Sequence, residues 1–555
     1  MEKGQILEFT IEDMSQEGKG IGKADGFAVF VDGAVVGDRV RVQLQKVKKR
    51  YGFGKLLEIL EESPDRIESF CERQGECGGC PYGQLSYDAQ LALKEKQVRD
   101  KLERLGGIND PVVYPIMAMD EPFRYRNKAS MPVSTGGLIT LKGGIVQPVH
   151  EPRVGFFGAR SHEVADCSDC WLQSEPAMAA AEALRQFMTE DHITSFDPRW
   201  EKGLMRHMIV RTAAGTGEVM VILVINGKAI PNAQKLVEML DEAIYNVPVY
   251  DDGPLAGVEF SLESVVINVN KSKNLDGPIL GEECITIAGK PTITEEVSGM
   301  KFEISPLSFY QVNRVQMVKL YDKVLEYADL KGGETVLDLY CGVGTIGLFC
   351  AREMEKKARE RATEADSDED VSGKAYAVHP GQVIGIESIK GAVLDANRNA
   401  TINGIVNARY VCGKAEEELP KMMGMASAQG GENSAHGSEG GKKPAIRISQ
   451  ADVAILDPPR AGCDERLLEA VVKAEPEKIV YVSCDPATLA RDIKWLGEHG
   501  YEFREATPCD MFPWTSHVET VCLLSNRKPD SYVHLNLKME DYYRIKDAQK
   551  EQDKK

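Results

Sequence analysis

The fold is decided by the stretch Thr335-Val336-Leu337-Asp338-Leu339-Tyr340-Cys341-Gly342-Val343-Gly344-Thr345-Ile346-Gly347. Its first half is an apolar run typical of a buried strand, and its glycines then let the backbone turn tightly into a helix. A backbone turn of this kind can approach a nucleotide cofactor closely. Because dinucleotides and S-adenosylmethionine are both bound in this way, the stretch alone predicts a nucleotide-binding site and leaves its ligand open.

Similar apolar runs recur between residues 291 and 535, at 383–387, 453–457 and 479–483. Each run ends in polar residues and is separated from the next by a helical pattern, which is typical of parallel strands buried on both faces. Glu387, at the end of the second run, is suited to hydrogen-bond the hydroxyls of a ribose. We therefore expect a Rossmann-like α/β domain over residues 291–535.

Two other strand ends carry chemically informative residues. The first, Asp457-Pro458-Pro459-Arg460, resembles the Asp-Pro-Pro motif of methyltransferases that act on amino groups, but Arg replaces the aromatic residue that stacks on the base. A strand end stiffened by proline is the structural alternative for this motif. The second places Cys484 directly after Ser483, at the edge of the sheet where α/β proteins bind ligands.

Cys484 and Glu519 are the residue types that methylation of uracil at C5 requires. A thiolate that adds to C6 makes C5 nucleophilic, so that C5 can attack the methyl group of a sulfonium ion. A base must then remove the C5 proton before the thiolate can leave. A Rossmann oxidoreductase, built on the same glycines, offers no role for Cys484, Glu519 or the Asp457–Arg460 motif.

Residues 291–527 resemble the catalytic domain of the bacterial RNA uracil-5-methyltransferase family. The resemblance rests on five motifs in order, which are 308–313 (SFYQVN), 337–344 (LDLYCGVG), 455–460 (ILDPPR), 481–486 (YVSCDP) and 517–521 (HVETV). It implies that the cofactor S-adenosylmethionine is bound by Gln311, Tyr340, Glu387 and Asp457. It also implies that Cys484 is the nucleophile and Glu519 the proton acceptor. Lys414 stands where relatives commonly place Asp, which is a departure near the expected adenine.

The chain has thirteen cysteines, and five of them lie close together at Cys71, Cys77, Cys80, Cys167 and Cys170. Thiolates bunched in this way point to a metal site, and their spacing alone leaves zinc and an iron–sulfur cluster both open. The resemblance implies a [4Fe–4S] cluster on Cys71, Cys77, Cys80 and Cys170, with Cys167 as a bystander. We expect Cys350, Cys412 and Cys522 to be buried as small apolar side chains.

Residues 1–62 show short strands and glycine-rich turns, and they resemble the TRAM module, an OB-like RNA-binding β-barrel. Within it, residues 46–51 are basic, and Tyr51 or Phe53 could stack on a base. We expect a mixed α+β central domain over 63–290 that carries the metal cluster, with a helix that begins near Ser86. Segments 354–375 and 424–446 read as surface insertions, and 536–555 as a polar tail.

The net charge of −19 does not favour a nucleic-acid partner, yet basic residues gather locally at 46–51, 124–128 and 206–211. No apolar stretch predicts a membrane span or a leader, so we expect a cytoplasmic protein, and a monomer. Within the family that the chain resembles, the transfer-RNA enzymes generally lack the barrel and the cluster, so the resemblance implies 23S ribosomal RNA as the partner. The alternatives are a transfer-RNA uridine, or an RNA-binding iron–sulfur protein without catalytic activity.

Overall fold

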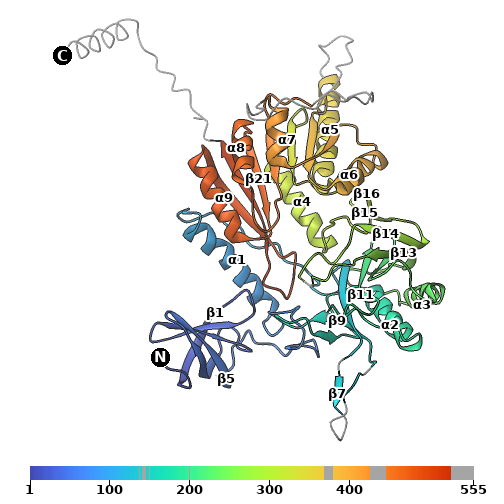
Figure 1. The fold of residues 1–555 in the computed structure, drawn as a ribbon. Helices are drawn as coiled ribbons and strands as arrows, with labels where there is room; N and C mark the ends of the chain where they lie inside the picture. The colour runs from blue at the N-terminus through green and yellow to red at the C-terminus, as the bar shows by residue number, and fades with distance from the viewer. Residues whose placement is uncertain are drawn as a thin grey trace, which may run out of the picture.

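The computed structural model of the chain describes residues 1–136, 138–140, 146–148, 150–198, 200–274, 276–367, 379–424 and 446–526. It contains three main β-structures (Figure 1). The N-terminal barrel lies at the lower left of the view and the central sheet at the lower right, while the C-terminal sheet lies above both. Within these ranges, no helix is long and apolar enough to cross a membrane.

The N-terminal barrel is closed, with the strand order β1-β2-β3-β5-β4. Its strands are β1 (Ile6–Met14), β2 (Gly20–Ala24), β3 (Phe27–Val31), β4 (Arg39–Val47) and β5 (Tyr51–Glu61). Alternate residues of these strands, such as Val40, Val42 and Leu44 of β4, point inward and are fully buried. This alternation is the pattern expected of strands with one wet face, and it confirms the predicted barrel.

The central sheet has the order β10-β9-β6-β11-β12-β13-β14. Its strands are β6 (Lys128–Ser134), β9 (Arg153–Phe157), β10 (Val164–Asp166), β11 (Met205–Ala213), β12 (Glu218–Ile225), β13 (Ser261–Val269) and β14 (Glu283–Gly289). Helices α2 (Glu175–Glu190) and α3 (Ala233–Tyr245) pack on one face through a shared apolar core. A small hairpin, β7 (Leu138–Thr140) and β8 (Val146–Pro148), follows β6.

The C-terminal sheet has the order β19-β18-β17-β20-β21-β23-β22. Its parallel strands are β17 (Thr335–Leu339), β18 (Gln382–Glu387), β19 (Ala408–Cys412), β20 (Val453–Leu456) and β21 (Lys478–Ser483). Two antiparallel strands, β22 (Tyr501–Cys509) and β23 (Glu519–Asn526), extend the sheet beyond β21. The prediction of an α/β sheet with buried parallel strands is confirmed.

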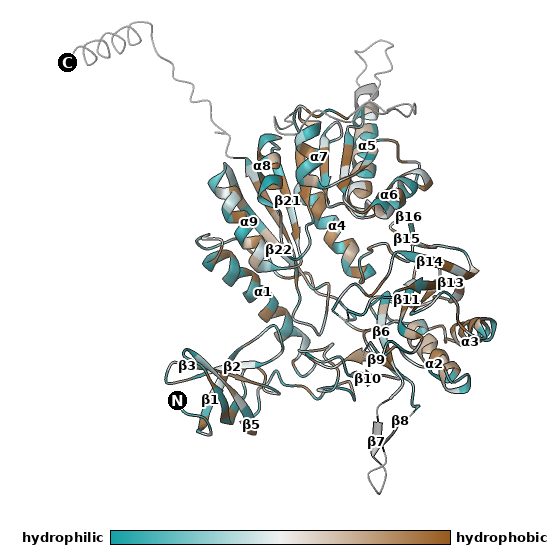
Figure 2. Ribbon diagram, in the orientation of Figure 1, coloured by the Kyte–Doolittle hydropathy of each residue, from teal (hydrophilic) through white to brown (hydrophobic). Residues whose placement is uncertain are grey.

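Helices cover both faces of the C-terminal sheet, which explains its nearly continuous apolar strands (Figure 2). One core involves α4 (Arg314–Ala328), α5 (Thr345–Ser367) and α6 (Lys390–Ile402). The other involves α7 (Ala415–Met422), α8 (Glu465–Lys473) and α9 (Pro486–Glu498). The hairpin β15 (Ile293–Val297) and β16 (Met300–Ile304) precedes α4.

Helix α1 (Tyr87–Arg104) packs against α9, although it lies far away in the sequence. Its N-cap is Ser86, whose side chain accepts a hydrogen bond from the Ala89 amide, as the sequence indicates. Val98 and Leu102 of α1 are buried in the same core as α7 to α9. Residues of the segment before the central sheet therefore complete one face of the C-terminal sheet.

Two sequence-based expectations need correction. The expected insertion at 354–375 is helical as far as Ser367, because α5 continues without interruption to that residue. Cys412 is exposed, because β19 is the edge strand of the sheet, whereas Cys350 and Cys522 are buried as expected. Most of segment 424–446 and the whole of the tail 536–555 lie outside the described residues.

Candidate active site

The predicted site residues of the C-terminal sheet gather at one edge. Tyr340, Glu387, Asp457 and Cys484 stand at or just after the carboxyl ends of β17, β18, β20 and β21. These four strands are consecutive neighbours in the sheet and run parallel, so their carboxyl ends meet at the same edge. This is the edge where open α/β sheets bind their ligands.

The glycine-rich turn after β17 is held open by hydrogen bonds to two carboxylates. The Gly342 amide donates to Glu387 Oε2 over 3.2 Å, and the Gly347 amide donates to Asp338 Oδ2 over 2.9 Å. Gly342 has a φ of +55°, and a Cβ placed there would meet no atom within 4 Å. The turn therefore leaves open space above Glu387, which is the carboxylate expected to bind a ribose.

Asp338 and Asp457 are buried carboxyls beneath this turn. Burial raises the pKa of Asp457 to about 7, and burial together with the charge of Asp457 raises that of Asp338 to about 7. Asp338 Oδ1 is buried and has no hydrogen-bond partner among the residues that are described. These carboxyls make the edge of the sheet acidic and poorly solvated, which favours a ligand that carries positive charge.

Cys484 lies between the end of β21 and the first turn of α9. The N-cap of α9 is Asp485, which accepts hydrogen bonds from the Ala487 and Thr488 amides at 2.8 and 3.2 Å. The Asp485 amide in turn donates to Ser483 Oγ over 3.2 Å. The backbone on both sides of Cys484 is therefore fixed, and its half-buried thiol stands at the edge of the sheet.

Glu519 is the first residue of β23, which pairs with β21 in an antiparallel register. Ser483 lies opposite Thr520, so the same register places Cys484 opposite Glu519. Burial raises the pKa of Glu519 to about 8, with a further contribution from Asp457. Burial and then the Glu519 charge raise the pKa of Cys484 to about 11. The structure therefore brings together the thiol and the carboxyl that the sequence predicts.

Arg460 and His517 lie beside this pair, and neither was predicted as a site residue. Arg460 Nη2 is 3.4 Å from His517 Nε2. Burial and the Arg460 charge lower the pKa of His517 to about 4, so its ring is neutral at pH 7. Arg460 lowers the pKa of both Cys484 and Glu519. The signal for it was present in the sequence, since an arginine stands where an aromatic residue was expected.

Gln311 lies on the loop between β16 and α4, and its residue is 7% exposed. Asn127, the residue before β6, holds this loop, since its Nδ2 donates to the Gln311 carbonyl over 2.9 Å. Arg211 Nη2 donates to the carbonyls of Pro306 and Ser308 in the same loop. The position of the fourth predicted cofactor residue therefore depends on contacts from the central sheet.

The five cysteines line one cavity of about 430 Å³ between the segment 71–80, β6 and β9. Arg126 and Lys128 line the same cavity. Over the described part of the chain, no three Cys, His, Asp or Glu side chains are close enough to hold a single metal ion. The cysteines predicted to bind a metal thus surround a common space without converging on one point.

The loop that leads into Glu519 is anchored by a buried ion pair. Lys94 Nζ of α1 lies 2.5 Å from Asp510 Oδ1, and both side chains are fully buried. The Tyr87 hydroxyl donates to Asp510 Oδ2 over 2.8 Å, and Lys94 also donates to the Phe512 carbonyl over 3.0 Å. Helix α1 therefore holds the chain that connects β22 to Glu519.

We expect Lys94→Met to destabilise the protein by about 3 kcal/mol or more, because the Asp510 carboxylate would remain buried without its cation. Lys96→Met is the matched control, since Lys96 lies on the same helix and forms an exposed pair with Asp13. Thermal unfolding of both variants measures the effect. Equal melting temperatures for the two would contradict the anchoring role of Lys94.

We also expect the Cys484 thiol to react slowly with iodoacetamide near neutral pH and faster as pH rises, because only the thiolate reacts. Glu519→Gln removes the carboxylate charge that raises the pKa of Cys484, so alkylation at about pH 9 should become faster. Peptide mass spectrometry separates Cys484 from the other cysteines. A rate that does not depend on pH or on Glu519 would rule out this electrostatic coupling.

Comparisons with known proteins agree with this geometry. A model of the TRAM domain matches residues 1–57, and a model described as tRNA (Uracil-5-)-methyltransferase matches residues 373–527. Uncharacterized RNA methyltransferases of Halalkalibacterium halodurans and Caldanaerobacter subterraneus are 38% and 40% identical, and the alignments cover 94% of this chain and 97% and 98% of theirs.

A solved structure is similar over most of the chain. It is the Pyrococcus abyssi tRNA (uracil-54, C5)-methyltransferase in complex with S-adenosyl-L-homocysteine, with 27% identity and a TM-score of 0.63. The match covers 93% of this chain and 99% of that one. The extent of these matches, together with the carboxyl-edge site and the N-terminal barrel, shows that this chain belongs to the RNA uracil-5-methyltransferase family and carries a TRAM domain.

Proposed function

We propose that this protein transfers a methyl group from S-adenosylmethionine to C5 of a uracil in RNA, through a covalent bond between Cys484 and C6. The observation that carries the proposal is the register of β21 and β23, which sets Cys484 opposite Glu519 at the carboxyl edge of the sheet. A thiol and a buried carboxyl at this place supply the nucleophile and the base that the reaction needs.

The reaction proceeds in four steps. The Cys484 thiolate adds to C6, and the C5–C6 double bond opens to give an enolate. C5 then attacks the methyl carbon, and the methyl–sulfur bond breaks to leave S-adenosylhomocysteine. The Glu519 carboxylate removes the C5 proton, and the electrons of that bond re-form the double bond and expel the thiolate. With its pKa raised to about 8, Glu519 is a stronger base than an ordinary carboxylate.

S-adenosylmethionine suits the acidic edge of the sheet after β17 and β18 by its charge. Glu387 would accept hydrogen bonds from the ribose, and Gln311, Tyr340 and Asp457 would contact the rest of the cofactor. The buried, unpartnered oxygen of Asp338 and the raised pKa of Asp457 favour a cationic ligand, and the sulfonium and the amino group are both cationic. Bound cofactor should therefore lower the pKa of these carboxyls.

The barrel offers an RNA-binding surface. The rings of Phe30, Tyr51 and Phe53 lie 5.5 to 5.7 Å apart, and Tyr51 is 39% exposed. The basic residues of 46–50 lie at the turn between β4 and β5, next to this aromatic cluster. Stacking rings beside positive charge are typical of surfaces that bind unpaired nucleotides.

The barrel also lies near the nucleophile. A cavity of about 460 Å³ is lined by residues of β1, by α1, and by Asp485 and Ala487 at the start of α9. Ser516 Oγ, three residues before Glu519, donates to the Gln16 carbonyl of the barrel over 2.6 Å. RNA held by the barrel would therefore lie close to the edge that carries Cys484.

For the substrate we propose 23S ribosomal RNA, because the chain combines the barrel with the cysteine-lined cavity. The alternative is a transfer RNA, on which the Pyrococcus abyssi relative acts. Purified protein, labelled S-adenosylmethionine and separate transcripts of the two RNAs distinguish them. Mass spectrometry should find 5-methyluridine in the ribosomal transcript. Label in the transfer RNA alone would show that transfer RNA, and not ribosomal RNA, is the substrate. Label in neither RNA would contradict the proposed activity and favour an RNA-binding protein without it.

We further propose that Cys71, Cys77, Cys80 and Cys170 hold a [4Fe–4S] cluster. These cysteines line one cavity of about 430 Å³, which offers room for a cluster with an iron atom at each ligand. Arg126 and Lys128 line this cavity and would offset the negative charge of a thiolate-bound cluster. We propose a structural role for the cluster.

We expect protein purified without oxygen to be brown and to contain iron and sulfide. Cys170→Ser should lose most of the iron, because it removes a ligand, whereas Cys167→Ser should keep it. Cys167 is the matched control, since it lines the same cavity and is more deeply buried. Iron analysis and the visible spectrum measure the effect. A colourless protein that contains zinc would refute the cluster.

A further inference from the structure

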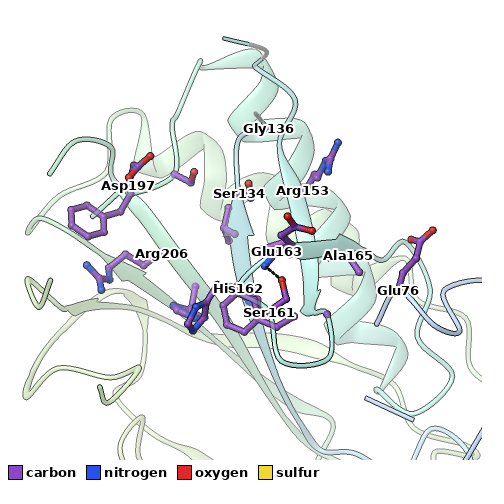
Figure 3. Close-up of a pocket in the computed structure, with 18 of the residues that line it drawn as sticks. Glu76, Ser134, Gly136, Arg153, Ser161, His162, Glu163, Ala165, Asp197 and Arg206 are labelled. Atoms are coloured by element: carbon purple, nitrogen blue, oxygen red, sulfur yellow. Dashed lines mark hydrogen bonds between the residues drawn. The ribbon is translucent and has the colours of Figure 1, made fainter. Parts of the chain in front are cut away.

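A cavity of about 1050 Å³ lies on the central sheet, away from the active site. It is bounded by the start of β11, the end of β6 and the segment that joins β9 to β10. Figure 3 shows Arg206 and Asp197 on one side of it and Glu163 and Ala165 on the other. The proposed reaction gives this cavity no role.

Arg206 lines this cavity with an incompletely satisfied guanidinium. The residue is only 7% exposed, and its Nη1 is buried without a hydrogen-bond partner among the residues that the structure describes. Its guanidinium carbon lies 4.3 Å from the centre of the Phe196 ring, which holds the planar group in place. Burial lowers its pKa. Burial of a guanidinium without a hydrogen-bond partner costs desolvation free energy, and a bound anion would offset this cost.

His207 adds a second unused polar atom to the same wall. Its Nδ1 is buried without a hydrogen-bond partner in the described part of the chain. Burial and the Arg206 charge lower its pKa to about 4, so the ring is neutral at pH 7 and one of its nitrogens can accept a hydrogen bond. Phe157 packs edge-on against both His207 and His162, at ring separations of 6.2 and 5.3 Å.

The chemistry of the walls selects the class of ligand. Arginine matches a phosphate, and the rings of Phe157, His162 and Phe196 offer apolar surface to a base. The cavity also carries the carboxylates of Glu76, Glu163 and Asp197, which would repel a run of phosphates. A wall that combines the buried guanidinium of Arg206, the more exposed Arg153, aromatic rings and hydrogen-bond acceptors is suited to a single unpaired nucleotide.

The cavity is connected to the active site by two paired strands. In β6 and β11, Pro132 lies opposite His207 at the cavity, and Lys128 lies opposite Arg211 at the other end. Arg211 holds the loop that carries Gln311. Arg206 and Arg211 are five residues apart, about 17 Å along the strand. A nucleotide in the cavity would thus lie apart from the target uridine and would not be the target itself.

We propose that this cavity binds one unpaired nucleotide of the RNA substrate, with its phosphate on Arg206 and its base against the aromatic wall. The inference rests on the proposed function, because it assumes an RNA substrate. It assigns the central sheet a direct part in RNA selection.

The test compares full-length wild type, Arg206→Ala and Arg206→Lys, each loaded with S-adenosylmethionine. The substrate is the unmodified RNA transcript that the wild type methylates. We expect Arg206→Ala to raise the KM for RNA about tenfold with little change in kcat. Arg206→Lys should be intermediate, because lysine keeps the charge without the planar fork. Lys235→Ala is the matched control, since Lys235 also lies over a phenyl ring but belongs to α3, outside the cavity.

Cross-linking gives a second measurement that does not depend on catalysis. A transcript with 4-thiouridine should cross-link to peptides of 195–207 in wild type and much less in Arg206→Ala, while both bind S-adenosylmethionine equally. If Arg206→Ala methylates RNA with an unchanged KM and the wild type gives no cross-link to residues 195–207, the nucleotide site alone is overturned. Cross-linking without methylation would overturn the proposed reaction alone. A wild type that binds no RNA would overturn both.

Discussion

Cys484→Ala should abolish methyl transfer to RNA, with a loss on the order of 10⁴-fold or more, because no other group can add to C6. Cys484 directly follows Ser483, which pairs with Thr520 next to Glu519, and the residues around it are fixed by the N-cap of α9. Removal of one thiol leaves these contacts intact. Binding of S-adenosylmethionine, measured by calorimetry, should therefore remain close to that of wild type.

The matched control is Cys284→Ala, because Cys284 is also a free cysteine but is exposed on β14 of the central sheet. It should methylate RNA at the wild-type rate. Product formation by Cys484→Ala at even a tenth of the wild-type rate would exclude the covalent route. A parallel loss of cofactor binding would instead show that the substitution disturbs the fold.

The C-terminal sheet could be predicted well from the sequence, for a physical reason. Its parallel strands are covered by helices on both faces, so they appear as apolar runs that end in polar residues. The sequence pattern of a strand does not show whether that strand lies at the edge of the sheet. Cys412 was therefore expected in the core, but β19 has a neighbour on one side only and Cys412 is exposed.

Contacts between distant segments could not be predicted. Lys94 falls among charged residues of α1 and would be assigned to a solvated helix face, yet it is fully buried against Asp510. Similarly, Asn127 just before β6 holds Gln311 itself, and Arg211 of β11 holds residues shortly before it. Such pairs depend on how the sheets pack, and packing is not encoded in a local pattern.

The positions of the site residues could be predicted from the sequence only in part. Their motifs follow strand ends, so the common edge could be predicted for Tyr340, Glu387, Asp457 and Cys484. Glu519 begins an antiparallel strand inserted after β22, and its register with β21 becomes visible only in the structure. The domain limits at 62, 290 and 535 remain predictions. Helix α1 belongs to the predicted domain 63–290 but packs on the C-terminal sheet.

The raised pKa of Glu519 explains why its carboxylate can remove the C5 proton. Burial and Asp457 both disfavour its charged form, whereas Arg460 favours it. In the free protein at neutral pH the carboxyl is therefore largely protonated. The carboxylate that removes the C5 proton therefore forms as pH rises. Turnover should accordingly rise with pH through about 8.

Glu519→Gln should accumulate a covalent RNA–protein adduct. Addition of Cys484 to C6 and methylation of C5 precede removal of the proton, so a glutamine that cannot accept it stops the reaction at the methylated adduct. Glutamine has nearly the same size as glutamate, and the register of β23 with β21 should persist. Turnover should fall by a factor on the order of 10² to 10⁴.

Denaturing gels with labelled RNA and labelled methyl groups measure this adduct. A slow-moving band that contains both labels should appear in Glu519→Gln and disappear in the double variant Cys484→Ala/Glu519→Gln. Asp485→Asn is a further control, because Asp485 neighbours the nucleophile but acts as the N-cap of α9, a role that asparagine can fill. It should form product and no lasting adduct. If Glu519→Gln turns over normally, the C5 proton leaves to another base, and the register that pairs Glu519 with Cys484 serves only to shape the pocket.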